Sequence, residues 1–101
     1  MRILMVCAGG MSSGLLMKQM RAYLKENGID GSVDAVAMIS SQDHYSDYDV
    51  VLVAPQVGYR LAGFRETTGL PCAVIPSFDY ATANCANIMR LVRELLRKDQ
   101  N

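Results

Sequence analysis

The sequence predicts an α/β fold: an open four-stranded parallel sheet, in the order 2-1-3-4, with helices on both faces. Short apolar runs alternate along the chain with longer segments of helical period. The apolar run at 50–53 is unbroken, as is typical of a strand covered on both faces. Right-handed crossovers then favour this strand order, with a switch point between the first and third strands.

The first half of the chain predicts two strands and one helix. We expect a buried strand at 2–6 and a second at 32–38, where small apolar residues alternate with polar ones. The intervening helix ends at Asn27-Gly28, a pair typical of helix C-termini. Residues 40–43 resemble a capping box and predict one short helical turn. The helical period runs through Leu15, Leu16, Gln19, Met20, Tyr23 and Leu24.

The second half predicts two further strands, at 50–53 and 73–75, and two helices. Pro55 can open the first of these helices, with Val57, Leu61 and Phe64 on its apolar face. Gly69 and Pro71 end that helix. The last helix is marked by an apolar stripe opposite a charged face. Its stripe comprises Cys85, Ile88, Met89, Val92, Leu95 and Leu96, and its charged face comprises Arg90, Arg93, Glu94 and Arg97.

Length and composition indicate a single globular domain over residues 1–101. Ten basic and ten acidic side chains cancel, so charge favours no nucleic-acid partner. Three cysteines without C-x-x-C or zinc-type spacing are typical of free thiols in a reducing compartment. No signal peptide or membrane span is recognised, so we expect a cytoplasmic protein. We also expect no metal and no cofactor.

The loop between the first strand and the first helix is the candidate site. It begins with Cys7, and its glycines let backbone amides turn inward toward an anion. The N-terminus of the following helix adds free N–H groups and the positive end of its dipole. A phosphoryl group fits such a site without any cationic side chain. The predicted phosphate-binding residues are Ala8, Gly9, Gly10, Met11, Ser12, Ser13 and Gly14.

Cys7 is the predicted nucleophile of this loop. Helix N-termini lower a cysteine pKa, and a thiolate attacks phosphorus readily. Taken alone, a strand-end cysteine is more often a small core residue, and glycines often only make a turn. The joint placement of both at the switch point favours the functional interpretation. The loop matches neither a Walker A motif nor a dinucleotide fingerprint.

The loop resembles the phosphocysteine loop of the enzyme IIB components of the phosphoenolpyruvate-dependent sugar phosphotransferase system, lactose/cellobiose type. The similarity covers nearly the whole chain and rests on three motifs. Mannitol- and galactitol-type relatives usually place a second glycine where Met11 stands, which favours the lactose/cellobiose branch. The motifs are CAGGMSS at 7–13, APQVGY at 54–59 and, more loosely, IPSFDY at 75–80.

This resemblance implies a phosphoryl relay on a flavodoxin-like fold. A phosphohistidine on a IIA partner phosphorylates Cys7, and a IIC membrane transporter presents the hydroxyl of a sugar, such as cellobiose or lactose, as final acceptor. Gln56 and Tyr59, after the third strand, and Tyr80, after the fourth, are possible accessory residues. Met11 is a candidate contact for a partner surface.

Two other functions are open at this point. A low-molecular-weight tyrosine phosphatase or arsenate reductase uses a similar loop, but needs an arginine where Ser13 stands and an Asp-Pro general acid, which this chain lacks. A flavodoxin-like binding module for phosphate or a nucleotide would leave Cys7 without a role. Structural roles are expected for Cys72 and Cys85 in the core and for His44 in a solvated loop.

Overall fold

The protein, described by a computed structural model over residues 1–7, 12–37 and 45–99, is built on one parallel sheet. Its strands are ordered β2-β1-β3-β4, and every pairing between neighbours is parallel. The predicted fold class and strand order are therefore confirmed. The strands are β1 at Arg2–Val6, β2 at Ser32–Val36, β3 at Val50–Val53 and β4 at Cys72–Val74.

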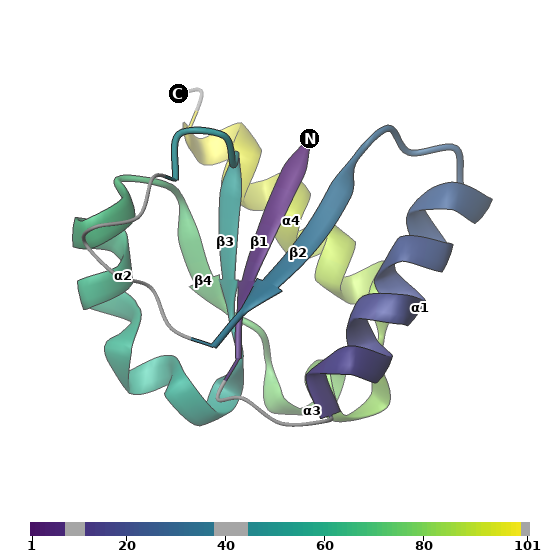
Figure 1. The fold of residues 1–101 in the computed structure, drawn as a ribbon, viewed down its shortest axis with the longest axis horizontal. Coiled ribbons are helices and arrows are strands. Elements are labelled where there is room, and N and C mark those ends of the chain that lie inside the picture. Colours follow the sequence, from purple (N-terminus) through teal and green to yellow (C-terminus); the bar gives the residue numbers. More distant parts are fainter. Residues whose placement is uncertain (8–11, 38–44, 100–101) are drawn as a thin grey trace.

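Helices cover both faces of this sheet (Figure 1). The first and last helices pack on one face, and α2 packs on the other. The carboxyl ends of the strands point to the bottom of Figure 1, where α1 begins and α3 lies. The helices are α1 at Ser12–Glu26, the 3-10 helix η1 at Pro55–Arg60, α2 at Leu61–Thr68, α3 at Ser77–Thr82 and α4 at Cys85–Asp99.

The two central strands divide their side chains between two cores. In β1, Ile3 and Met5 pack with α1 and α4, whereas Leu4 and Val6 pack with α2. The same alternation in β3 leaves all four of its residues fully buried. Because a strand sends successive side chains to opposite faces, a strand covered on both faces needs an unbroken apolar run.

The end of α1 explains how the chain turns into β2. Gly28 has a φ of 63°, in the left-handed region that glycine enters without steric cost. The Ile29 N–H donates to the Leu24 carbonyl at 2.9 Å, and the Gly28 N–H donates to the Lys25 carbonyl at 3.2 Å. These two bonds form a Schellman motif, so the helix end predicted at Asn27-Gly28 is confirmed.

Helix α3 was not expected from the sequence, and it ends in the same motif without a glycine. The Asn84 N–H donates to the Asp79 carbonyl at 2.9 Å, and the Ala83 N–H donates to the Tyr80 carbonyl at 3.3 Å. Ala83 has a φ of 51° and is the only non-glycine residue with positive φ among those described. A left-handed alanine costs roughly 1–2 kcal/mol, so the turn between α3 and α4 is strained.

Two sequence expectations are corrected on α1. Leu15 was expected on the apolar face, but 60% of it is exposed, whereas Met17 is buried with 4% exposed. Gln19 is exposed as well. The buried stripe comprises Leu16, Met17, Met20 and Leu24. Met20 lies three and four residues after Met17 and Leu16 and four before Leu24, and Leu15 lies off that stripe.

Other boundaries also differ from expectation. Strand β2 ends at Val36, although it was expected to continue to 38. The segment that Pro55 opens is a 3-10 helix with a kink at Val57, and the α-helix begins only at Leu61. Gly69 ends α2 in a left-handed conformation, as the sequence predicted. The last strand begins at Cys72, although the Ile75 N–H still donates to the Val53 carbonyl at 2.8 Å. Helix α4 has the predicted buried stripe and exposed arginines.

Candidate active site

Cys7 lies just beyond the carboxyl end of β1, in the centre of the sheet. Its N–H donates to the Val36 carbonyl of β2 at 2.9 Å. On the other side, the Ala54 N–H donates to the Val6 carbonyl at 2.8 Å. The end of β1 is thus held by both neighbouring strands, at the switch point where open α/β sheets bind ligands.

The Cys7 side chain belongs to the core cluster on the α1 and α4 face of the sheet. Only 3% of the residue is exposed. The chain re-enters the described range at Ser12, where α1 begins, so only four residues separate Cys7 from the helix N-terminus. The first turn of α1 holds no acidic residue. The free N–H groups and dipole of this turn therefore favour a negative charge nearby.

Several residues of the predicted phosphate loop lie outside the described residues. These are Ala8, Gly9, Gly10 and Met11. The expected helical turn at 40–43 and His44 also lie outside the described residues. Ser12, Ser13 and Gly14 open α1, although the first two have no described side chains. Among the described residues, nothing lies within 4 Å of a Cβ added at Gly14.

The 3-10 helix η1 brings Gln56 and Tyr59 to the same edge of the sheet. Both residues are exposed, and Tyr59 is 84% exposed. Gly58 lies close to β4, since an added Cβ there would lie 3.2 and 3.3 Å from the two methyl groups of Val74. The missing side chain at Gly58 allows η1 to pack directly against β4.

Tyr80 also lies at this edge, but it is half-buried against the core. It lines a small cavity of about 170 Å³ together with Leu15, Leu16, Ala81 and Ala83. This cavity joins the start of α1 to α3. The structure therefore brings Cys7, the start of α1, η1 and Tyr80 to one edge, as the positions after three different strands predicted.

Sequence reasoning missed two exposed apolar residues at this edge, Leu15 and Phe78. Together with Tyr59 they are the strongly exposed large apolar side chains of the described residues, at 60%, 73% and 84% exposure. They follow the carboxyl ends of β1, β4 and β3 respectively. We call this edge, defined by Leu15, Tyr59 and Phe78, the apolar rim. All three lie on elements that follow the carboxyl ends of strands, which makes this edge a candidate interaction surface.

Of the other two cysteines, Cys72 is buried in the core as expected, whereas Cys85 is half-buried against it. Burial raises the pKa of the Cys72 thiol, although a hydrogen bond from Thr68 and the charge of Arg65 partly oppose it. Burial also raises the pKa of the Cys85 thiol. Protonated thiols are poor nucleophiles, so neither is poised to accept a phosphoryl group.

Comparison with known proteins assigns the family. The family model described as "PTS system, Lactose/Cellobiose specific IIB subunit" matches residues 2–90. The chain belongs to this family. Its members are phosphoryl carriers of sugar phosphotransferase systems and act as phosphotransferases. The resemblance seen in the sequence, including the lactose/cellobiose branch, is therefore confirmed.

Individual relatives agree with this assignment. The galactose-specific EIIB component of Lactococcus lactis subsp. cremoris and the cellobiose-specific EIIB component of Lactococcus lactis subsp. lactis are each 28% identical, over 93% of this chain and 94% of theirs. A solved structure, the cellobiose-specific IIB component from Borrelia burgdorferi, has a TM-score of 0.77 and 30% identity. That alignment covers 97% of this chain and 93% of the other.

Proposed function

We propose that Cys7 of this IIB subunit accepts a phosphoryl group from a phosphohistidine on a IIA partner and passes it to a sugar. The observation that carries the proposal is the position of Cys7 at the carboxyl end of the central strand β1, shortly before the N-terminus of α1. The competing thiols are placed differently, because Cys72 lies at the start of β4 and Cys85 lies on α4.

Each transfer exchanges one bond to phosphorus. In the first, the Cys7 thiolate attacks, a P–S bond forms and the P–N bond of phosphohistidine breaks, with the imidazole leaving. In the second, a sugar hydroxyl attacks, a P–O bond forms and the P–S bond breaks, which regenerates the thiolate. The proton of the sugar hydroxyl passes to solvent in that step. The protein contributes positioning and charge stabilisation in both.

The loop from Ala8 to Gly14 is proposed to hold the phosphoryl oxygens with backbone amides. Two features support this role: the N-terminus of α1 supplies unpaired N–H groups, and its first turn carries no carboxylate that would repel an anion. Ser12 and Ser13 are proposed to add hydroxyl donors.

The apolar rim is proposed to receive the protein partners. Both the IIA donor and the IIC transporter must bring a reacting atom to the sulfur of Cys7, so their contact surfaces must include this edge. Exposed aromatic side chains are typical anchors of protein interfaces. Gln56, Tyr59 and Tyr80 are proposed as accessory residues because they surround the same edge.

The final acceptor is proposed to be a sugar of the cellobiose or lactose type, taken up through IIC. The named relatives differ in sugar, since one is galactose-specific and another cellobiose-specific. This variation on one fold is expected if the membrane component selects the sugar. Within the described ranges, no helix has the length and apolar character needed to cross a membrane. We propose that the chain acts in the cytoplasm.

The test is labelling with a phosphorylated IIA partner and its upstream phosphotransferases. The unmodified chain should take up one phosphoryl group, and Cys7→Ala should take up none. Matched controls are Cys72→Ala and Cys85→Ala, which should still be labelled because Cys72 lies at the start of β4 and Cys85 on α4, away from the loop that follows β1. Labelling of Cys7→Ala would exclude the proposed acceptor.

The same preparation separates a carrier from a phosphatase. A cysteine phosphatase holds the oxygens with an arginine and protonates the leaving group with an aspartic acid. Ser13 stands at the arginine position here, and no Asp-Pro occurs. We expect no turnover of aryl phosphates by the chain alone. Repeated turnover without any partner would revive the phosphatase.

A further inference from the structure

Asn84 joins helix α3 to helix α4 at a corner near the carboxyl edge of the sheet. Its N–H donates to the Asp79 carbonyl at 2.9 Å and thereby closes the end of α3. Its side-chain Oδ1 accepts from the Asn87 N–H at 3.2 Å, and its carbonyl accepts from the Ile88 N–H at 3.0 Å. Asn84 therefore caps the end of α3 with its backbone and the start of α4 with its side chain.

A second contact crosses this corner between two side chains. The Asn87 Nδ2 donates to the Asp79 Oδ1 at 3.1 Å, so the first turn of α4 is bonded to the first turn of α3. Both residues are half-buried, which limits the access of competing water. Hydrogen bonds to a carboxylate are stronger than those between neutral groups, and the N-terminus of α4 favours a negative charge beside it. We call the Asp79–Asn87 hydrogen bond the corner clamp.

Helix α3 depends on bonds at its ends because it buries little. It has six residues, and none of them is fully buried. A helix this short is not stable by itself. Its start is fixed to the sheet through Ile75, which is buried and whose N–H donates to the Val53 carbonyl at 2.8 Å. Its other end is fixed at the corner with α4, where Ala83 is held in a left-handed conformation.

The position of α3 decides what the carboxyl edge of the sheet presents. Phe78 of α3 belongs to the apolar rim, and Tyr80 lines the cavity of about 170 Å³ between α3 and the start of α1. Leu15 and Leu16 form the α1 wall of this cavity. Figure 1 shows α3 beside the start of α1, at the end of the sheet where the strands finish. A displacement of α3 would therefore move Phe78 relative to Leu15 and change the cavity.

We propose that Asp79 and Asn87 are positioning residues for phosphoryl transfer, because the corner clamp holds α3 where the phosphorylated partner meets the apolar rim. Neither residue contacts the phosphoryl group in this proposal. The clamp instead fixes Phe78 and Tyr80 before the partner binds, so that less conformational freedom is lost on binding. This inference rests on the proposed function, in which the rim receives the partner that phosphorylates Cys7.

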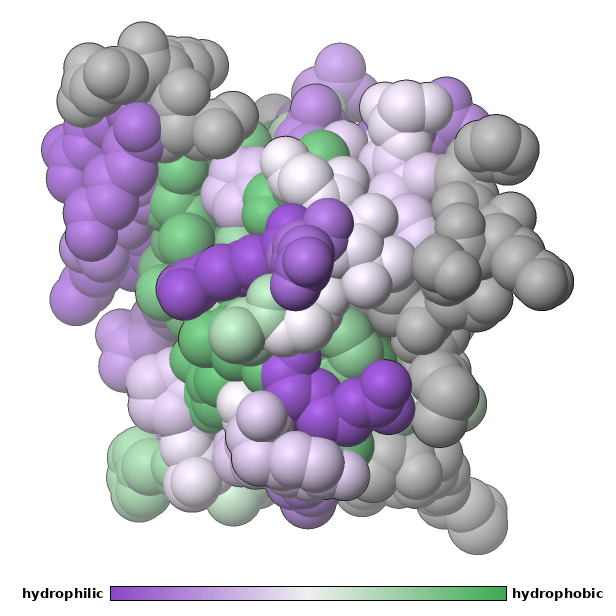
Figure 2. Space-filling model, turned by 90° about the vertical axis from the view of Figure 1, so that its left-hand side faces the viewer, coloured by the Kyte–Doolittle hydropathy of each residue, from purple (hydrophilic) through white to green (hydrophobic). Residues whose placement is uncertain are grey.

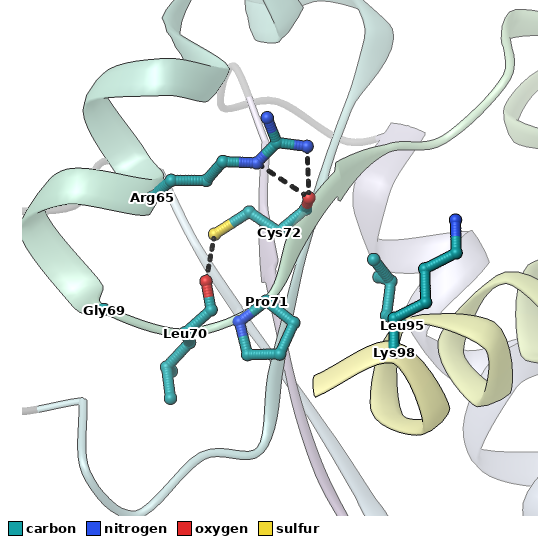
Figure 3. A pocket seen from close by; sticks show the side chains of 7 residues that line it. All are labelled: Arg65, Gly69, Leu70, Pro71, Cys72, Leu95 and Lys98. Atoms are coloured by element: carbon teal, nitrogen blue, oxygen red, sulfur yellow. Dashed lines mark hydrogen bonds between the residues drawn. The ribbon is translucent and has the colours of Figure 1, made fainter. Parts of the chain in front are cut away.

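The opposite end of the sheet offers a matched contact that is remote from Cys7. Arg65 of α2 donates from Nε and Nη2 to the Cys72 carbonyl, at 3.3 and 3.1 Å (Figure 3). It lines a cavity of about 360 Å³ between the ends of α2 and α4. On the side of the molecule that carries α2, hydrophilic side chains lie across an apolar strip (Figure 2). Because Cys72 is at the amino end of β4, Arg65→Met removes a tertiary hydrogen bond without touching α3.

The test exchanges the two groups of the corner clamp. Asn87→Asp places two carboxylates in contact, and we expect it to raise the KM for a phosphorylated IIA partner about tenfold, with little change in the maximal rate of Cys7 labelling. Asp79→Asn keeps an acceptor of the same size without its charge, and should raise the KM about threefold. The double variant restores one amide and one carboxylate in exchanged positions, so its KM should return to within about twofold of the unmodified chain. Arg65→Met should leave the KM unchanged.

Hydrogen exchange in the unphosphorylated chain measures the clamp without any partner. The amides of Ala83 and Asn84, which close α3, should exchange about tenfold faster in Asn87→Asp and should recover in the double variant. The amides of β3 should exchange as in the unmodified chain, which shows that the variants are folded. If Asn87→Asp does not fold, the smaller increase in KM of Asp79→Asn and its reversal in the double variant decide the question.

Three results would overturn the inference. An unchanged KM in Asn87→Asp would leave the corner clamp without a role in partner binding. A double variant that keeps the KM of Asn87→Asp would show that the hydrogen bond does not act as the clamp. Equal increases in Arg65→Met and Asn87→Asp would show that any lost tertiary contact has the same effect. Each of these results leaves Cys7 labelled, whereas failure of the proposed function is recognised separately by labelling of Cys7→Ala.

Discussion

The apolar rim and the two side edges of the sheet are exposed in opposite ways. The rim presents side chains that a folded protein normally buries, Leu15, Tyr59 and Phe78, at the end of the sheet that carries Cys7. The side edges present backbone groups that a sheet normally pairs, and each edge has an arginine on its outward carbonyl. One surface is left open and the other two are covered.

This difference separates productive contacts from unproductive ones. A carrier must be bound and released by partners at Cys7, and short-lived side-chain contacts on a small rim suit that requirement. Strand pairing is less selective, because any chain can supply the backbone groups. A carrier that paired through its edges would lose its freedom to alternate between partners.

Placing a charge on the rim should have the largest effect. We expect Phe78→Asp and Tyr59→Asp each to raise the KM for a phosphorylated IIA partner by about 30-fold, as for loss of an interface anchor. The maximal rate of Cys7 labelling at saturating partner should change little, since neither residue holds the phosphoryl group. Initial rates over a series of partner concentrations separate the two quantities.

Edge variants provide the control for this measurement. Arg21→Met and Arg65→Met should leave the KM unchanged, because both lie away from the rim. A KM that rises equally in rim and edge variants would contradict the division between open and closed surfaces.

Adding a methyl group at Gly58, where η1 packs against Val74 of β4, should have an intermediate effect. Gly58→Ala places a methyl group 3.2 Å from a methyl group of Val74, so Val74 or η1 has to shift by a few tenths of an ångström, and we expect η1 to shift together with Tyr59. Overpacking of this kind costs about 1–3 kcal/mol. Thermal unfolding should show the loss of stability, and the KM for the partner should rise because the rim is displaced.

Gly63→Ala is its matched control within α2. An added Cβ at Gly63 meets nothing within 4 Å. Exchanging glycine for alanine inside a helix favours folding by about 0.5–1 kcal/mol. The two substitutions should therefore shift the free energy of unfolding in opposite directions. The same sign in both would show that η1 does not depend on close packing at Gly58.

The smallest expected effect is at the end of α3. Ala83→Gly should stabilise the chain by roughly 1 kcal/mol, because glycine relieves the left-handed strain at φ 51°. Ala81→Gly, inside α3, should instead destabilise by about 1 kcal/mol. Chemical denaturation of both variants gives the comparison, and a destabilised Ala83→Gly would mean that the turn carries no strain.

Much of the architecture could be predicted from local pattern. The unbroken run at Val50–Val53 indicated a central strand, and Gly28 indicated the end of α1. Strand–helix alternation then led to the order of the sheet, and this order put Cys7 at the switch point. These features are short-range, because periodicity and turn chemistry act within a few residues.

The missed features depend on local departures from pattern. Helix α3 has six residues, too few to show a period, and its alanine end carries no glycine signal. The close approach of η1 to β4 joins Gly58 and Val74, which lie far apart in the sequence, so no local pattern predicts it. Leu15 was misplaced because several apolar residues in succession on α1 leave the centre of the buried face undetermined.

The sequence by itself determined the four strands, their order and the position of Cys7 at the carboxyl edge, because these follow from periodicity, chain reversal and the handedness of crossovers. The tertiary structure alone decided which side chains the edges and the rim present. Arg21 reaches Val33, and Arg65 reaches Cys72, only after a helix has packed beside its edge strand. The rim likewise exists only once three separate strand ends lie side by side, since no single segment contains it.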